Sequence, residues 1–362
     1  MKVGIVTVHD STNIGSYMQA LGLQEVVKQH GDTPYFIKTR SLFSTLCLFL
    51  GYNTAKSVRS FKSFVWFCLS LIKHPKMTAE KYKKYKTYRK DWMLYENIIS
   101  VKSANAKKLD VVLLGSDEIW NVQKPTFQNP YFYGIGLKAG KKAGYAVSLG
   151  KATKEELVPF EHLRDGIREL DSILYRDDYT KDMLKEFGIE STERICDPTL
   201  QADIRKYMKK PEEVDLPKED YIAVYSYRLD KTTIEWIKRF AKENGLKIAA
   251  ISLPQSWCDF YINCSPSEFG AALSKARYVY TNTFHGTIFS SLYHTKYVAL
   301  ATQPKVMDVL KLLGLEDHAL PEELDYEAFS NMLKRDYDFS NMEEKIVDLR
   351  KASHKAYEKL MS

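Results

Sequence analysis

The sequence predicts an α/β protein made of two successive βαβ domains. Three observations lead to this class: the length of 362 residues, the alternation of short apolar runs with helical segments, and a polar stretch at 202–220 between two such series. At roughly 150 residues per domain, the length suits two domains. The composition is 44% hydrophobic, 27% charged and 13% aromatic, which is typical of globular chains and excludes disorder as the dominant state.

The first domain is expected at residues 1–205. It begins with a β-branched apolar run at Val3–Val8, typical of a parallel strand buried on both faces. A helix at about Ser16–Gln29 and a strand at Pro34–Lys38 follow, and the alternation then breaks off near Arg40. It resumes with strands at Leu109–Leu114, Ala143–Leu149 and Ile173–Tyr175, followed by a helix at Tyr179–Phe187 and a short strand at Arg194–Cys196.

The second domain is expected at residues 206–320 and is followed by C-terminal helices at 321–362. Its strands are predicted at Tyr221–Tyr227, Lys247–Ser252, Tyr278–Thr281 and Tyr297–Ala301, its helices at 231–244, 266–276 and 287–293, and the C-terminal helices at 325–335 and 341–360. Ligands of open α/β sheets bind beyond the carboxyl ends of the strands. The cleft between two such domains is therefore the expected ligand site.

The charge of the chain is concentrated in one window. Residues 41–90 contain eleven Lys or Arg and a single acid, Glu80, whereas the whole chain has a net charge of +7. Outside this window acidic residues slightly outnumber basic ones. This pattern argues against a general nucleic-acid binder and favours one local anionic partner surface.

The basic window belongs to an expected helical insert at 41–105 in the first domain. Leu42–Leu50 and Phe64–Ile72 are apolar stretches of nine residues. Each is too short to span a bilayer, which needs about 20 residues. Together they suit a helical hairpin lying on an anionic membrane surface. The alternative is a helical subdomain that packs on the main body and has a solvated basic face.

The five cysteines show no zinc-site or CxxC spacing, so we expect no metal site and a reducing compartment. The N-terminal MKVGIVTV has one Lys and then a strand pattern, which does not resemble a signal peptide. The expected location is cytoplasmic, peripheral on the inner face of the cell membrane.

Two loops of the first domain are candidates for substrate binding. Asn13, Gly15 and Ser16 lie between the first strand and first helix, where backbone N–H groups suit an anion; the alternative is an ordinary turn with Ser16 as helix cap. Ser116, Asp117 and Asn121 follow the strand ending at Leu114. Asp117 is a candidate catalytic carboxylate there, and the alternative is a helix N-cap. A GxGxxG motif is absent, so the sequence gives little support for NAD binding.

The segment at 281–287 is the most informative of the second domain. It places His285, Gly286 and Thr287 between a strand and an expected helix start, and Thr283 precedes them. The positive end of a helix attracts an anion and lowers the pKa of an imidazole, so His285 is a candidate acid or base.

Two arginines at strand ends could hold an anionic substrate. Arg176 and Arg228 each follow a predicted strand, and a guanidinium suits a carboxylate or phosphate. The alternative is that each pairs with a neighbouring acid, Asp177 or Asp178 for the first and Asp230 for the second.

Several motifs together resemble the polysaccharide pyruvyl transferase family. They are NIGSYMQA, GSDEIWN, YAVSLG, ILYRDDYT followed by KEFGI, CDPTL, and SPSEFGAALSKARYVYTNTFHGTIFSSLYHTK, and they occur in the family's order across about residues 1–300. The resemblance implies a glycosyltransferase-B-like pair of Rossmann-type domains. It also implies transfer of a pyruvyl group from phosphoenolpyruvate to two sugar hydroxyls, giving a cyclic ketal.

The same resemblance assigns roles to single residues. The family's essential His falls on His285, its Gly on Gly286, and its acidic loop residue on Asp117. Where many members have Asp-Arg or Asp-Ser, this chain has Asn282-Thr283. Because Thr283 has no charge, either another cation holds the donor, with Arg176 and Arg228 as the candidates, or the donor differs.

The sequence-based hypothesis is thus a cofactor-free pyruvyl transferase acting on a hexose of a lipid-linked glycan precursor. The enzymatic alternative is a nucleotide-sugar glycosyltransferase of the same architecture. A membrane-bound scaffold without activity is the non-enzymatic alternative.

Overall fold

The computed structural model describes residues 1–50, 61–73, 75–321 and 323–362. The chain divides into two compact units. Unit 1 comprises Met1–Ile204 and Leu349–Ser362, and unit 2 comprises Arg205–Asp348. The C-terminal region, expected as a separate part at 321–362, is divided between the two units, since its last helix begins in unit 2 and ends in unit 1.

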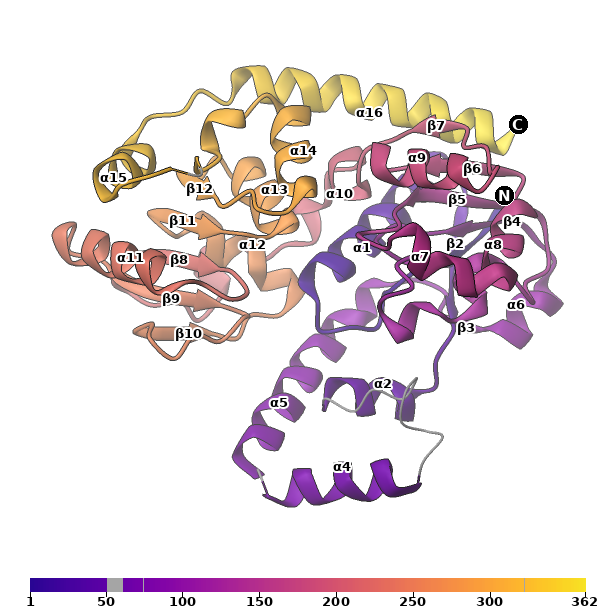
Figure 1. Ribbon diagram of the computed structural model, residues 1–362, viewed down its shortest axis with the longest axis horizontal. Coiled ribbons are helices and arrows are strands. Elements are labelled where there is room, and N and C mark those ends of the chain that lie inside the picture. The colour runs from indigo at the N-terminus through magenta and orange to yellow at the C-terminus, as the bar shows by residue number, and fades with distance from the viewer. Residues whose placement is uncertain (51–60, 74, 322) are drawn as a thin grey trace. The chain divides into compact units, whose positions relative to one another are not determined.

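Unit 1 is built on a parallel sheet of seven strands in the order β3-β2-β1-β4-β5-β6-β7 (Figure 1). The strands are β1 Lys2–Val6, β2 Thr33–Lys38, β3 Ile99–Ser100, β4 Leu109–Leu114, β5 Ala139–Val147, β6 Ser172–Tyr175 and β7 Glu193–Arg194. All its strand pairs are parallel, so all the carboxyl ends lie at one edge of the sheet. The polar loops follow at that edge.

Helices cover this sheet and pack closely on it. They are α1 Ile14–Gln29, α6 Val101–Lys107, α7 Lys154–Leu157, α8 Glu161–Arg168, α9 Asp178–Glu186, α10 Pro198–Gln201 and the end of α16 Ser340–Met361. Nearly all of α1 is buried, and a Cβ at Gly22 would lie 2.6 Å from the carbonyl oxygen of Pro198. A glycine at this position therefore lets α1 contact α10 directly.

A large aromatic side chain from the loop after β4 packs in the core of unit 1. Trp120 is fully buried, its indole N–H donates to the carbonyl of Phe132 at 2.8 Å, and its ring stacks on Tyr133. Trp120 is therefore a core residue.

Unit 2 has a parallel sheet of five strands in the order β10-β9-β8-β11-β12. The strands are β8 Tyr221–Tyr225, β9 Lys247–Ile251, β10 Phe260–Ile262, β11 Tyr278–Thr281 and β12 Tyr297–Ala299, and the helices are α11 Lys231–Glu243, α12 Pro266–Ser274, α13 Phe284–Leu292, α14 Pro304–Leu313, α15 Tyr326–Lys334 and the start of α16. Phe240, Tyr278 and Phe329 belong to the core on one face of this sheet. The predicted α/β class with two parallel sheets is confirmed.

Several boundaries differ from the prediction. β1 ends at Val6 instead of Val8 and β8 at Tyr225 instead of Tyr227, because the apolar residues that follow turn out of the sheet into loops. The short strands β3 and β10 and the helix α14 were not predicted. The most consequential difference is that α13 starts at Phe284, three residues before the predicted start.

The described part of the basic window is helical, as expected, and forms α2 Leu42–Phe49, α4 Phe61–Lys73 and α5 Pro75–Asp91 within unit 1, whereas 51–60 and 74 lie outside the described residues. Phe49, Tyr85 and Trp92 contact one another edge to face and hold α2 against α5. Across the described residues, no helix is both long and apolar enough to cross a membrane.

Candidate functional site

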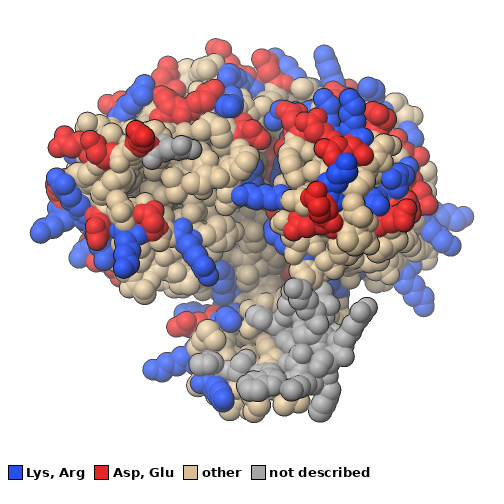
Figure 2. Space-filling view, viewed as in Figure 1, with Lys and Arg blue, Asp and Glu red and all other residues tan. Residues whose placement is uncertain are grey.

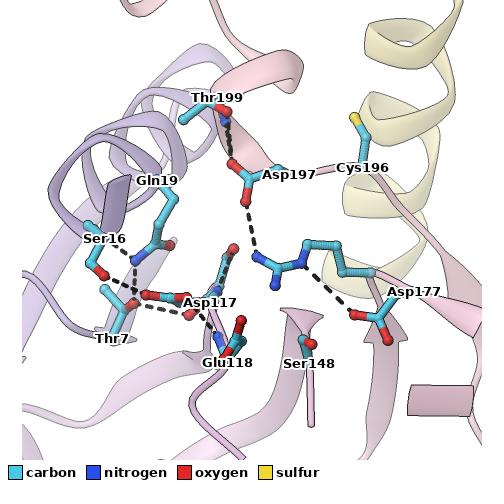
Figure 3. A network of polar contacts seen from close by, with 12 residues as sticks. Thr7, Ser16, Gln19, Asp117, Glu118, Ser148, Asp177, Cys196, Asp197 and Thr199 are labelled. Carbon is cyan, nitrogen blue, oxygen red and sulfur yellow. Dashed lines mark hydrogen bonds and ion pairs between the residues drawn. The ribbon is translucent and has the colours of Figure 1, made fainter. Parts of the chain in front are cut away.

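A polar network lies at the carboxyl edge of the unit 1 sheet. It is formed by the residues that follow β1, β4, β5 and β6, together with the first turns of α1 and the segment before α10. Figure 3 shows Ser16 in the first turn of α1, Asp117 and Glu118 on the loop after β4, and Asp197 and Thr199 at the start of α10. Four strands thus bring together side chains that are far apart in the sequence.

The start of α1 is capped by the chain itself. The Asn13 side-chain oxygen accepts hydrogen bonds from the backbone N–H groups of Gly15, at 3.0 Å, and Ser16, at 3.4 Å. The cap is therefore Asn13 and not Ser16. The N–H groups of Gly15 and Ser16, which the sequence suggested as part of an anion site, therefore already donate to Asn13.

Asp117 links the loop after β4 to α1. Its Oδ2 accepts a hydrogen bond of 2.5 Å from the hydroxyl of Ser16, and its Oδ1 accepts one of 2.8 Å from the N–H of Glu118. The backbone of Asp117 has a φ of 82°, and no helix starts here, so the N-cap alternative is wrong. The carboxylate is half-buried.

The neighbours of Asp117 are more deeply buried. Ser116 is fully buried, its carbonyl accepts from the Thr7 hydroxyl, and its own hydroxyl accepts from the N–H of Asp117. Asn121 is buried and donates to the carboxylate of Glu118, which also pairs with Lys124 at 2.9 Å. Ser116 and Asn121, expected to bind substrate, support the loop that carries Asp117.

Arg176 is held in a buried ion pair. Its side chain is 7% exposed, and its Nη1 lies 3.2 Å from Oδ2 of Asp197, whose side chain is completely buried. Oδ1 of Asp197 accepts hydrogen bonds from the N–H and hydroxyl of Thr199. Burial opposes the charge of Arg176, but Asp197, Asp177, Asp117 and Glu118 outweigh it and raise the pKa of the guanidinium. The partner is Asp197, 21 residues away, and the contact to Asp177 is longer, at 4.0 Å.

In unit 2, Thr283 caps α13. Its hydroxyl accepts a 3.0 Å hydrogen bond from the N–H of Gly286 and lies 3.0 Å from the hydroxyl of Thr281, which donates to the carbonyl of Tyr225. The Thr287 hydroxyl donates to the carbonyl of Thr283. The hydroxyls of Thr283 and Thr287 and the N–H of Gly286 thus bond within the unit, although the sequence suggested them as substrate ligands.

Gly286 permits this close arrangement. A Cβ there would lie 2.2 Å from the Thr281 hydroxyl, 2.5 Å from the Thr283 hydroxyl and 2.8 Å from the Tyr225 ring. Since real Cβ atoms do not approach so closely, any larger residue would push the start of α13 away from β8 and β11.

His285 lies in the first turn of α13, directly after the capping residue, instead of in a loop before the helix. It is half-buried, and its ring contacts that of Phe284 edge to face at 5.1 Å. The imidazole therefore stands at the carboxyl edge of the unit 2 sheet, at the positive end of a nine-residue helix.

Arg228 lies at the same edge, on a loop fixed by two side chains. The Asn282 side chain accepts from the N–H of Tyr227 at 3.0 Å and donates to the carbonyl of Arg228 at 3.4 Å. The Gln255 side chain donates to the carbonyls of Ser226 and Tyr227. The Arg228 guanidinium itself is exposed, and among the residues described it forms no ion pair. Asp230, its expected neighbour, instead caps α11 through Thr233.

Three residues of these networks were not singled out from the sequence: Glu118, Asp197 and Gln255. Asp197 stands inside the CDPTL motif, which was the signal that could have found it, whereas Gln255 has no local signal. Within the described parts of the chain, no group of three or more His, Cys, Asp or Glu could hold a metal ion.

The family model for polysaccharide pyruvyl transferase matches residues 13–304, which is most of the chain. The chain belongs to the polysaccharide pyruvyl transferase family. The match includes both the Asp117 loop and the start of α13. No curated protein sequence matches the chain significantly.

Solved structures show what the fold of this chain resembles. S. aureus MnaA, solved with UDP, is 12% identical with a TM-score of 0.55, and the likeness covers 100% of this chain and 98% of that one. A putative UDP-N-acetylglucosamine 2-epimerase from Listeria monocytogenes is 10% identical with a TM-score of 0.56, covering 99% and 97%. At these identities the likeness concerns the fold alone, which is glycosyltransferase-B-like, with two Rossmann-like domains.

Proposed function

We propose that this transferase moves a pyruvyl group from phosphoenolpyruvate to two hydroxyls of a hexose in a lipid-linked glycan precursor, forming a cyclic ketal. The observation that carries the proposal is the family match over residues 13–304, which includes His285. The exposed Arg228 at the same sheet edge as His285 supports it. The scheme uses no cofactor besides the donor.

Arg228 is the residue proposed to hold the donor. Phosphoenolpyruvate carries a phosphate and a carboxylate, and a guanidinium can bind either with two parallel hydrogen bonds. Asn282 bonds to the carbonyl of Arg228 and Gln255 to that of Tyr227, so the loop needs little ordering when the donor binds. Arg176, the other candidate, already pairs with Asp197 and would have to give up that partner.

His285 is proposed to move the proton. One sugar hydroxyl adds through its oxygen to C2 of the donor and loses its proton, while C3 gains a proton and becomes a methyl group. The C2–O bond to phosphate then breaks, and phosphate leaves with the bonding electrons. The second hydroxyl attacks C2, loses its proton and closes the ketal. An imidazole suits such transfers because its pKa lies near neutral pH.

Asp117 is proposed to orient or activate a sugar hydroxyl from unit 1. Its carboxylate is already fixed by Ser16 and by the N–H of Glu118. Asp117→Asn would keep a hydrogen-bond acceptor for Ser16 and remove the charge. We expect lower turnover with an unchanged fold, and unchanged turnover would remove Asp117 from the mechanism.

The second candidate function is transfer from a nucleotide sugar, which the shared fold with a UDP-bound protein supports. Incubation with phosphoenolpyruvate or with UDP-sugars, in each case with hexose-containing glycan acceptors, separates the two functions. We expect inorganic phosphate and a pyruvylated acceptor from phosphoenolpyruvate only, and both products should form far more slowly with His285→Ala. Release of UDP with a glycosylated acceptor would establish the second function instead.

A further inference from the structure

The insert between β2 and β3 exposes apolar side chains that the proposed reaction does not use. Val65, Leu69 and Ile72 of α4 are all exposed, Ile72 to 76%. Their spacing of four and three residues places them on one face of the helix. Leu42 and Phe43 in the first turn of α2 are also exposed, Phe43 to 65%.

This exposure is concentrated. Half of the large apolar side chains that are exposed among the described residues lie within 42–82. Single exposed apolar residues are normal on protein surfaces, but a cluster on one small structural element marks an interaction site.

The charge of α5 indicates the kind of surface that the insert binds. Lys76, Lys83, Lys86 and Lys90 are exposed, and their spacing of seven, three and four residues places them on one face of the helix. Tyr85 and Tyr88 are buried on the opposite face. Figure 2 shows Lys and Arg side chains projecting from the described part of the insert. An anionic surface is the complement of such a face.

The dimensions exclude a spanning role for these helices. α4 has 13 residues and is therefore about 20 Å long, whereas the hydrocarbon core is about 30 Å thick. Short amphipathic helices with basic neighbours instead lie in the interface, with apolar side chains among the headgroups.

We propose that this insert docks on an anionic phospholipid surface, with the exposed apolar residues of α2 and α4 in the headgroup region and the lysine face of α5 at the lipid phosphates. The proposal does not depend on the reaction, because its test measures binding alone. It would place the protein at the membrane where a lipid-linked acceptor resides.

Flotation with lipid vesicles tests the proposal. The full chain should float with vesicles containing phosphatidylserine at low salt, and a much smaller fraction of it should float with pure phosphatidylcholine, where only the apolar contact acts. Rising salt should weaken the binding without abolishing it, because the apolar contact is insensitive to screening. Wild-type protein that stays at the bottom with anionic vesicles at low salt would overturn the proposal.

Two variants separate the contributions, each with a matched control. Lys76→Glu, Lys83→Glu, Lys86→Glu and Lys90→Glu together should remove the salt-sensitive binding, whereas the same four changes at the exposed Lys181, Lys185, Lys238 and Lys242 should not. Leu69→Gln with Ile72→Gln should abolish the binding that survives high salt, whereas Val158→Gln with Val347→Gln, also exposed, should leave it intact. A concentration-dependent dimer that only the Leu69 and Ile72 changes disrupt, without vesicle binding, would make the occupant a second copy of the chain and overturn the proposal.

Discussion

Arg176 and Arg228 hold comparable positions in the two units, each following a parallel strand at the carboxyl edge of its sheet. Arg176 is buried and paired with Asp197, whereas Arg228 is exposed on a loop that other side chains fix. Both have acidic neighbours in the sequence. The difference between them is the partner. Arg176 has a buried carboxylate within reach, and Arg228, which forms no ion pair among the described residues, is exposed where a ligand could reach it.

The two units therefore use the same sheet edge differently. In unit 1 the Arg176 guanidinium is neutralised by carboxylates inside the protein, and Asp117 is held by Ser16 and by the N–H of Glu118. In unit 2 the side chains of Thr283 and Asn282 bond to backbone groups at the sheet edge, and His285 and Arg228 are the residues there that we propose to act on the donor. Four predictions test this difference and a fifth tests the core of unit 2; they run from the largest expected effect to the smallest.

His285→Ala should lower turnover by about 10²–10⁴-fold, the usual contribution of a positioned proton donor or acceptor. Circular dichroism and thermal unfolding should show an intact fold. His162→Ala, an exposed histidine on α8, is the control and should keep full turnover. Near-normal turnover in a folded His285→Ala protein would show that His285 takes no part in the reaction.

Arg176→Ala should destabilise unit 1 by about 3–5 kcal/mol, because it leaves the buried carboxylate of Asp197 without its cation. Denaturant unfolding measures the loss, and Arg228→Ala is the control that should unfold like the wild type. Arg176→Met combined with Asp197→Asn should recover part of the stability, since Asn keeps an acceptor for Thr199 and removes the charge. If Arg176→Ala has the same free energy of unfolding as the wild type, the buried ion pair with Asp197 does not stabilise unit 1.

The stability of unit 2 should fall as the pH drops from about 6.5 towards 4. Burial lowers the pKa of His318 to about 4, and its ring is enclosed between Tyr297 and Tyr337. The unfolded chain binds a proton below pH 6.5 that the folded chain does not, so stability is present above this pH and lost below it. The loss at pH 4 is on the order of 3 kcal/mol. A His318→Phe protein should show a flatter dependence of its melting temperature on pH over this window; an unchanged slope would contradict the assignment.

Arg228→Ala should raise the KM for phosphoenolpyruvate about tenfold or more, which corresponds to about 1.4 kcal/mol of lost binding. The KM for the acceptor should change less. Arg228→Lys should give an intermediate value, because a lysine keeps the charge without the planar pair of donors. Steady-state kinetics with either substrate varied measure both KM values. An unchanged KM for phosphoenolpyruvate would show that Arg228 does not bind the donor.

Thr283→Ala should cost about 1 kcal/mol of stability, the usual contribution of a helix N-cap, with turnover nearly retained in the folded protein. Thr283→Ser keeps the capping oxygen and should restore the stability. A large loss of turnover in a stable Thr283→Ala protein would mean that this side chain touches substrate as well as capping α13.

Much of the fold could be predicted from periodicity. β4 and β11 have the predicted bounds, since buried parallel strands read as continuous apolar runs that end at Gly or at polar residues. Short edge strands such as β3, with two residues, leave no such signal. The predicted start of α13 was wrong because Phe-His-Gly contains glycine, a poor helix former, in the first turn. The hydrogen bond from the N–H of Gly286 to the hydroxyl of Thr283 fixes the actual boundary.

The sequence by itself determined the α/β class, the polar loops at the strand ends, the basic insert and the identity of the motif residues. These depend on local patterns of charge, size and apolar spacing. Only the tertiary structure decided which side chains are engaged across the sheet edges: Arg176 with Asp197, and Asn282 with the loop of Arg228. These pairings join segments up to 55 residues apart, and they depend on which strands lie next to one another in the sheet, which no local pattern encodes.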